Sequence, residues 1–85
     1  MEITNNTVNQ QFEVRRGDHL GYMVYRERDG VLYLMHTEVP EPLAGQGIGG
    51  ALVQYALAYA HSKSLTYAAY CSFAKGYLEK HPPED

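Results

Sequence analysis

The sequence has little of what marks secreted, membrane-spanning or nucleic-acid-binding proteins. It contains one cysteine in 85 residues, Cys71, so an internal disulfide is excluded and a reducing, cytoplasmic compartment is expected. No apolar run approaches the roughly 20 residues that cross a bilayer. The N-terminus lacks the basic-then-apolar pattern typical of a signal peptide. We therefore expect no membrane partner.

Positive charge is also scarce. Seven Lys and Arg residues stand against ten Asp and Glu, a formal net charge of −3 at pH 7, and no basic block is present. Because nucleic-acid affinity comes largely from basic side chains that neutralise phosphates, no nucleic-acid partner is expected. No metal site is expected either. The length predicts one domain over residues 1–85, which buries roughly 60–65% of its unfolded surface.

Hydrophobic periodicity predicts three antiparallel strands in the first half of the chain. Residues 1–9 are polar and rich in Asn, and we expect a loose lead-in there. Residues 11–15 alternate with period two, and a second alternating run over 20–28 ends at the hairpin signal Asp29-Gly30. Residues 31–37 are apolar on both faces, so this third strand is expected to be central in the sheet.

The second half of the chain predicts a helix, a strand and a helix. Two prolines in Val39-Pro40-Glu41-Pro42 end the third strand, because proline lacks the N–H that a sheet needs. Apolar residues then recur at helical spacing over 47–60, residues 65–71 are rich in β-formers, and 73–80 is typical of a short helix. A strand, crossover helix and strand form a right-handed unit with parallel strands. The predicted class is α+β, with a curved, mostly antiparallel sheet, one parallel strand pair and two helices.

The most distinctive stretch holds four glycines, in Gly45-Gln46-Gly47-Ile48-Gly49-Gly50. A glycine loop that opens a helix presents unpaired N–H groups at the positive end of the helix dipole, which favours anions such as phosphate. The spacing satisfies the dinucleotide pattern G-x-G-x-x-G, but residues 66–71 lack the acidic residue expected about 20 positions later. Ala51-Leu52 replaces the Lys-Ser/Thr of a nucleotide P-loop. The glycine loop therefore still predicts a ligand with a phosphate group. It predicts neither a dinucleotide site nor a nucleotide P-loop.

The glycine loop is part of a longer pattern that resembles a known family. The pattern consists of His36-Thr37-Glu38-Val39, then Gly45-Gln46-Gly47-Ile48-Gly49, and later in the chain Cys71-Ser72-Phe73-Ala74-Lys75 and Tyr77-Leu78-Glu79-Lys80. This combination resembles a subfamily of very small proteins in the GNAT acetyltransferase superfamily. The resemblance covers residues 31–83 well and the first two strands by pattern. It implies a truncated GNAT-like fold, in which the third and fourth strands splay apart, and an acetyl-CoA ligand.

The resemblance also implies how acetyl-CoA binds. The pyrophosphate would contact the glycine loop, and the pantetheine arm would enter between the splayed strands. The ligand-binding residues implied in this way are Thr37, Val39, Gly45, Gln46, Gly47, Ile48, Gly49, Gly50 and Ser72. Two features depart from the family pattern. Ala44 stands where the superfamily often has Arg or Gln, and the N-terminal strand and paired helices that help to build the acceptor site have no counterpart.

Cys71 and His36 are the candidate catalytic residues. The helix that follows Cys71 favours a thiolate, and the resembling family has a cysteine here that is proposed to accept the acetyl group and pass it on. A buried structural cysteine is the alternative. His36 is a candidate general base, or else a hydrogen-bonded core histidine, because it alternates with Leu32 and Leu34. Ser72 is expected to cap the last helix.

The sequence thus predicts a protein that binds acetyl-CoA and transfers the acetyl group to an amine or thiol acceptor that no motif identifies. Two alternatives stay open. One is a non-catalytic CoA-binding or protein-interaction module, and the other is a structural protein without a cofactor.

Overall fold

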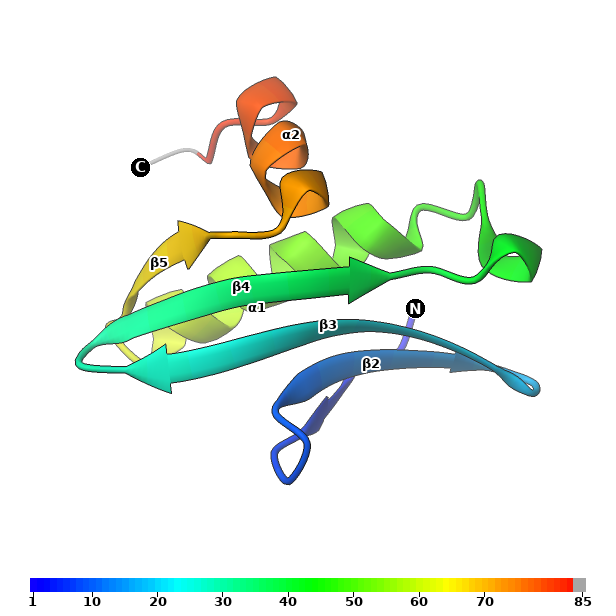
Figure 1. The fold of residues 1–85 in the computed structure, drawn as a ribbon, viewed down its shortest axis with the longest axis horizontal. Coiled ribbons are helices and arrows are strands. Elements are labelled where there is room, and N and C mark those ends of the chain that lie inside the picture. The colour runs from blue at the N-terminus through cyan, green and yellow to red at the C-terminus, as the bar shows by residue number, and fades with distance from the viewer. Residues whose placement is uncertain (84–85) are drawn as a thin grey trace.

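The alternating first half of the chain folds as an antiparallel meander, and the second half adds one parallel strand and two helices (Figure 1). The computed structural model describes residues 1–83. In chain order the elements are β1 (Thr4–Asn6), β2 (Gln11–Arg16), β3 (His19–Arg28), β4 (Val31–Glu38), the short 3-10 helix η1 (Glu41–Leu43), α1 (Ile48–Ser62), β5 (Thr66–Ala69) and α2 (Ser72–Lys80). The strands lie in the order β1-β2-β3-β4-β5, with β4 and β5 parallel and the other neighbours antiparallel. The predicted α+β architecture is confirmed.

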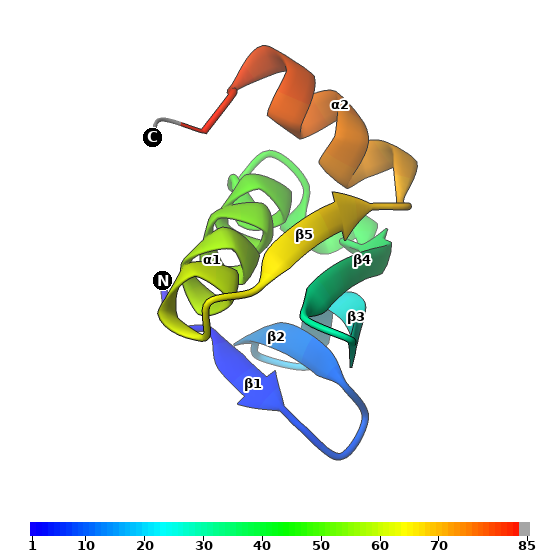
Figure 2. The ribbon, with the colours of Figure 1, turned by 90° about the vertical axis from the view of Figure 1, so that its left-hand side faces the viewer.

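One face of the sheet is covered by α1, which passes behind β4 in Figure 1 and lies beside the strands in Figure 2. The buried residues of α1 are Ile48, Gly49, Leu52, Val53, Ala56 and Ala60. On the sheet, the ring of Phe12 stacks on Tyr25 with centroids 4.3 Å apart and packs edge-on against Tyr55 and Tyr59 of α1. Full burial of one such side chain contributes about 1.5–3 kcal/mol, so this cluster holds α1 on β2 and β3. Among the residues described, neither helix is long and apolar enough to span a membrane.

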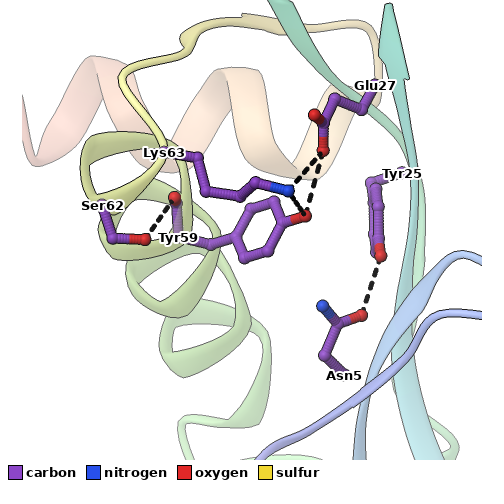
Figure 3. Close-up of polar contacts among 6 residues, drawn as sticks. All are labelled: Asn5, Tyr25, Glu27, Tyr59, Ser62 and Lys63. Atoms are coloured by element: carbon purple, nitrogen blue, oxygen red, sulfur yellow. Dashed lines mark hydrogen bonds and ion pairs between the residues drawn. The ribbon is translucent and has the colours of Figure 1, made fainter.

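The expected loose lead-in over residues 1–9 is wrong, because it contains the edge strand β1. Its polar side chains find partners on the neighbouring strands. The Tyr25 hydroxyl donates to Asn5 Oδ1 at 2.8 Å (Figure 3), and Asn6 Nδ2 donates to Glu13 at 2.9 Å. Burial raises the pKa of the Tyr25 phenol, although the hydrogen bond to Asn5 acts in the opposite direction. Asparagine is a poor strand former by propensity, and side-chain hydrogen bonding across the sheet overrides that propensity here.

The C-terminal end of α1 is tied to β3 by a small polar network (Figure 3). The Tyr59 hydroxyl donates to Glu27 Oε1 at 3.0 Å, and Lys63 Nζ donates to the Tyr59 hydroxyl at 3.2 Å. Lys63 Nζ also lies 3.6 Å from Glu27 Oε1. The hydrogen bond to Tyr59, with the nearby Glu27 carboxylate, raises the pKa of Lys63. The network holds the carboxylate of Glu27 on the side of the sheet that α1 covers.

A β-bulge on β4 changes the direction in which its side chains face. Two consecutive residues of β3, Val24 and Tyr25, pair with His36 and Leu34, so Met35 is an extra residue on β4. An extra residue reverses the two-residue alternation of the strand beyond it. The side chains of residues 36–38 therefore face the opposite way from the one that counting on from Leu34 predicts.

The parallel pair of β4 and β5 is short and then diverges, as Figure 1 shows. Pairing extends from Val31 and Thr66 to Leu34 and Ala69. The carbonyl of Leu34 accepts from two successive N–H groups, those of residues 70 and 71, at 2.9 and 3.0 Å. Beyond this point β4 continues to Glu38, whereas β5 ends at Ala69 and the chain enters α2 at Ser72. The splayed strand pair that the resemblance implies is present.

Candidate functional site

The divergence of β4 and β5 opens a groove of about 350 Å³ on the helix-covered side of the sheet. We call it the splay groove. Its lining residues are Thr37, Val39, Leu43, Ala44, Gly45, Gly47, Ile48, Gly49, Gly50 and Phe73. They come from the end of β4, from η1 and the glycine loop, from the first turn of α1 and from the start of α2. The groove therefore lies at the C-terminal edge of two parallel strands, where open α/β sheets place their ligands.

The glycine loop adopts a backbone shape that side chains disfavour. Gly45 has φ +80°, and Gly47, the N-cap of α1, has φ +75°. A Cβ in this left-handed region costs roughly 1–2 kcal/mol. The N–H groups of residues 45–50 have no hydrogen-bond acceptor within residues 1–83, and the first backbone bond of the helix runs from Ala51 N to the Gly47 carbonyl at 3.0 Å. The loop thus presents a run of free donors at the positive end of a helix.

The other two glycines serve a different purpose, namely close packing of the two helices. A Cβ atom at Gly49 would lie 2.5 Å from Cζ of Phe73, and one at Gly50 would lie 2.8 Å from Cε2 of Tyr77. Tyr77 is held in this position because its hydroxyl accepts from Gln54 Nε2 at 2.9 Å. Gly49 and Gly50 therefore let α2 approach the first turn of α1, which closes one side of the splay groove.

Cys71 lies beside the groove, in contact with one of its lining residues. Its Sγ is 3.1 Å from the hydroxyl of Thr37 and accepts from Ala74 N at 3.3 Å. The side chain is 7% exposed and belongs to the hydrophobic core. The bulge at Met35 places Thr37 opposite Met23 on the inward face, and so brings the hydroxyl to the thiol. Sequence order gave no hint of this pair, because the two residues are 34 positions apart.

The expectation that Ser72 caps the last helix is wrong. Cys71 is the N-cap of α2, with φ −86° and ψ 135°, and its sulfur accepts the hydrogen bond from Ala74 N that a serine hydroxyl was expected to accept. Ser72 is the first helical residue and is exposed. Neither Ser72 nor Gln46, which is also exposed, lines the groove. The remaining residues predicted for the ligand all line it.

His36 does not lie in the core, so the core-histidine alternative is wrong. Its side chain is 57% exposed, and its Nε2 lies 3.1 Å from Glu38 Oε1. The β-bulge places His36 opposite Val24 on the face that α1 leaves uncovered. His36 and Cys71 are therefore on opposite faces of the sheet, and the structure does not bring the two predicted catalytic residues together.

Three groove residues were missed by the sequence reading, namely Leu43, Ala44 and Phe73. Leu43 is buried at the end of η1, which the proline pair had marked as a departure from the sheet. Phe73 is 45% exposed and lies over Gly49. The sequence did contain a signal for Phe73, because it is an aromatic residue in the first turn of a helix that follows a parallel strand.

Comparison with known proteins agrees with this geometry. Residues 11–85 match the family model described as GCN5-related N-acetyl-transferase. The fold is similar to the solution structure of a protein from Staphylococcus aureus that is provisionally described as a GCN5-like N-acetyltransferase. The TM-score is 0.74 at 32% sequence identity, over 94% of this chain and 79% of that chain. No curated protein matched the sequence. The chain belongs to the GCN5-related N-acetyltransferase family, and its predicted GNAT-like fold is confirmed.

Proposed function

We propose that this protein binds acetyl-CoA in the splay groove and transfers the acetyl group to an amine or thiol acceptor. The observation that carries the proposal is the run of N–H groups at residues 45–50, which have no acceptor within residues 1–83 and adjoin the groove. Unpaired backbone donors at a helix N-terminus are suited to a pyrophosphate. Each such charge-assisted hydrogen bond contributes about 1.5–3 kcal/mol net.

The groove also suits the rest of the ligand. From the glycine loop it continues to Thr37 and Val39 at the end of β4, in the direction that leads to the thiol of Cys71. Its other walls are apolar, from Leu43, Ile48 and Phe73, which matches the alkyl parts of a pantetheine arm. Because Ala44 offers no polar side chain, the backbone donors of the loop supply the recognition of the phosphates.

Cys71 is the proposed carrier of the acetyl group. Its sulfur attacks the carbonyl carbon of the thioester, the bond from that carbon to the CoA sulfur breaks, and CoA takes up the proton that Cys71 releases. The acceptor amine then attacks the new thioester, its carbon–sulfur bond breaks, and a proton from the amine returns to Cys71. Ala74 N and the Thr37 hydroxyl, at 3.3 and 3.1 Å, are the groups that can donate to the sulfur anion.

The proposed role of His36 is limited to the other face of the sheet. Its contact with Glu38 at 3.1 Å orients the imidazole there. It is therefore a candidate base for an acceptor amine that approaches from the uncovered face, and not for the thiol of Cys71.

A non-catalytic CoA-binding module is the second candidate function. The burial of Cys71 and its cap hydrogen bond to Ala74 favour it, because they give the cysteine a structural role without any chemistry. In this case acetyl-CoA would bind in the same groove, and the thiol would stay unmodified.

Native mass spectrometry with acetyl-CoA distinguishes the two. We expect a one-to-one complex and, after denaturation, an added acetyl mass that is lost in Cys71→Ala and retained in Thr37→Ser. A complex without the acetyl mass, together with no transfer to any amine in a mixed panel, would favour the binding module. Failure to form any complex at high acetyl-CoA concentration would overturn both.

A further inference from the structure

The uncovered face of the sheet holds a second cavity, of about 540 Å³. We call it the arginine hollow. The side chains that matter for its chemistry are Arg26, Arg28, Tyr33, Met35 and Tyr70. Arg26 and Arg28 alternate on β3 with the buried Tyr25, so both guanidinium groups lie on the face opposite α1. The hollow and the splay groove therefore flank the same diverging strands from opposite sides.

The charge in the hollow is unbalanced. Within residues 1–83, neither Arg26 nor Arg28 has a carboxylate at ion-pair distance. The one acidic residue on the lining is Glu27, whose carboxylate is held by Tyr59 and Lys63 on the helix side of the sheet (Figure 3). One guanidinium nitrogen of Arg26 donates to the Tyr25 carbonyl at 2.7 Å, which fixes that arginine and leaves its other donors free. Two neighbouring guanidinium groups without a counter-ion suit a carboxylate or a phosphate.

The opposite wall of the hollow is apolar and exposed. Tyr33 and Tyr70 pack edge to face with ring centroids 5.4 Å apart, yet Tyr70 remains 65% exposed. Met35, the bulge residue of β4, is 39% exposed on the same lining. Large apolar side chains exposed beside free charge are typical of a surface that binds a ligand.

The apolar wall adjoins the proposed reaction centre. Tyr70 directly precedes Cys71, and Met35 lies two residues before Thr37, whose hydroxyl contacts the thiol. Both residues lie where β4 and β5 begin to diverge. A molecule in the hollow thus has its apolar end at the gap between these strands, while acetyl-CoA would reach the same gap from the splay groove.

We propose that the arginine hollow binds the acceptor, and that the acceptor is an amine carrying a carboxylate or phosphate. The anionic group pairs with Arg26 and Arg28, and the carbon skeleton lies against Tyr33, Tyr70 and Met35 with its amine directed to the strand gap. This assignment rests on the proposed acetyl transfer. The binding step itself requires no acetyl-CoA and is tested without it.

The test is a titration followed by the backbone amide resonances of residues 26–28, 33–35 and 70. The probes are two matched pairs, L-phenylalanine with phenethylamine and O-phosphoethanolamine with ethanolamine, which differ only in the anionic group. We expect one anionic probe to bind at least ten-fold more tightly than its partner, which keeps the ammonium group and lacks the anionic group, and the responding pair distinguishes carboxylate from phosphate. Arg28→Gln and Arg26→Gln should each lower that affinity by about ten-fold or more. Arg16→Gln, with the same charge change at the far end of β2, should leave it unchanged.

Equal affinity within both pairs, or the same loss with Arg16→Gln as with Arg28→Gln, would overturn the proposal. A parallel titration with acetyl-CoA, read at residues 45–50, separates the two inferences. Binding of acetyl-CoA without anion-selective binding in the hollow would refute the acceptor assignment alone. Anion-selective binding without any acetyl-CoA binding would refute the acetyl transfer, and with it the role of the hollow as an acceptor site.

Discussion

The substitution Gly49→Ala tests whether the second half of the glycine loop exists for helix packing. The new methyl group would lie 2.5 Å from Cζ of Phe73 and within 3.2 Å of two further ring atoms, so the ring and α2 must shift. Overpacking of this kind typically costs about 1–3 kcal/mol. Alanine in place of glycine within a helix gains up to about 1 kcal/mol in the opposite direction. We therefore expect Gly49→Ala to lower the free energy of unfolding by about 0–2 kcal/mol once the gain in helix propensity is subtracted.

A double-mutant cycle with Phe73→Ala isolates the contact. When the ring is removed, the clash disappears and only the helix propensity remains, so Gly49→Ala should become neutral or stabilising. The expected coupling energy between the two positions is about 1–3 kcal/mol. Equilibrium urea unfolding of the four proteins measures it. The same effect of Gly49→Ala in both backgrounds would refute the packing role and leave Gly49 as a phosphate-loop residue only.

Three further outcomes follow from the geometry. Gly47→Ala forces a Cβ into φ +75° and should cost about 1–2 kcal/mol, whereas Gly76→Ala, at a helical position with open space, should be neutral or stabilising in the same urea assay. Because burial raises the pKa of Tyr25, its phenol keeps a proton that the unfolded chain loses above about pH 10. The free energy of unfolding should therefore fall as pH rises past that value. In a series of unfolding measurements at different pH, Tyr25→Phe should reduce the slope of this fall. Thr37→Val removes the hydroxyl 3.1 Å from Cys71 and should slow acetylation of the thiol at least several-fold in a time course by mass spectrometry; an unchanged rate would show that the contact has no part in the chemistry.

The order and type of the main elements followed from the sequence because periodicity and turn chemistry agree along most of the chain. Alternation over residues 11–15 and 20–28 and helical spacing over 47–60 each reflect one buried face. The hairpin at Asp29-Gly30, with φ of +53° and +80°, was marked by residues that tolerate this conformation. The strand β1 was missed because its stability comes from partners on β2 and β3, and no local pattern records them.

The site was predicted less completely, for three physical reasons. The bulge at Met35 reverses the alternation of β4, so counting from Leu34 left a core position open for His36 and gave no reason to pair Thr37 with Cys71. The sulfur of Cys71 caps α2, whereas the known preference for serine at the N-cap had predicted Ser72. The four glycines form one motif in the sequence but divide into two backbone and two packing positions, which only the placement of α2 reveals.

The central claim is that the backbone donors of residues 45–50 hold a pyrophosphate. Its most direct test compares acetyl-CoA with S-acetylpantetheine, which carries the same thioester and lacks the pyrophosphate together with the 3′-phosphoadenosine, by calorimetric titration and amide chemical shifts. We predict that acetyl-CoA binds at least ten-fold more tightly and shifts the amides of the glycine loop. Equal affinities, or acetyl-CoA shifts that leave residues 45–50 unmoved, would contradict the account.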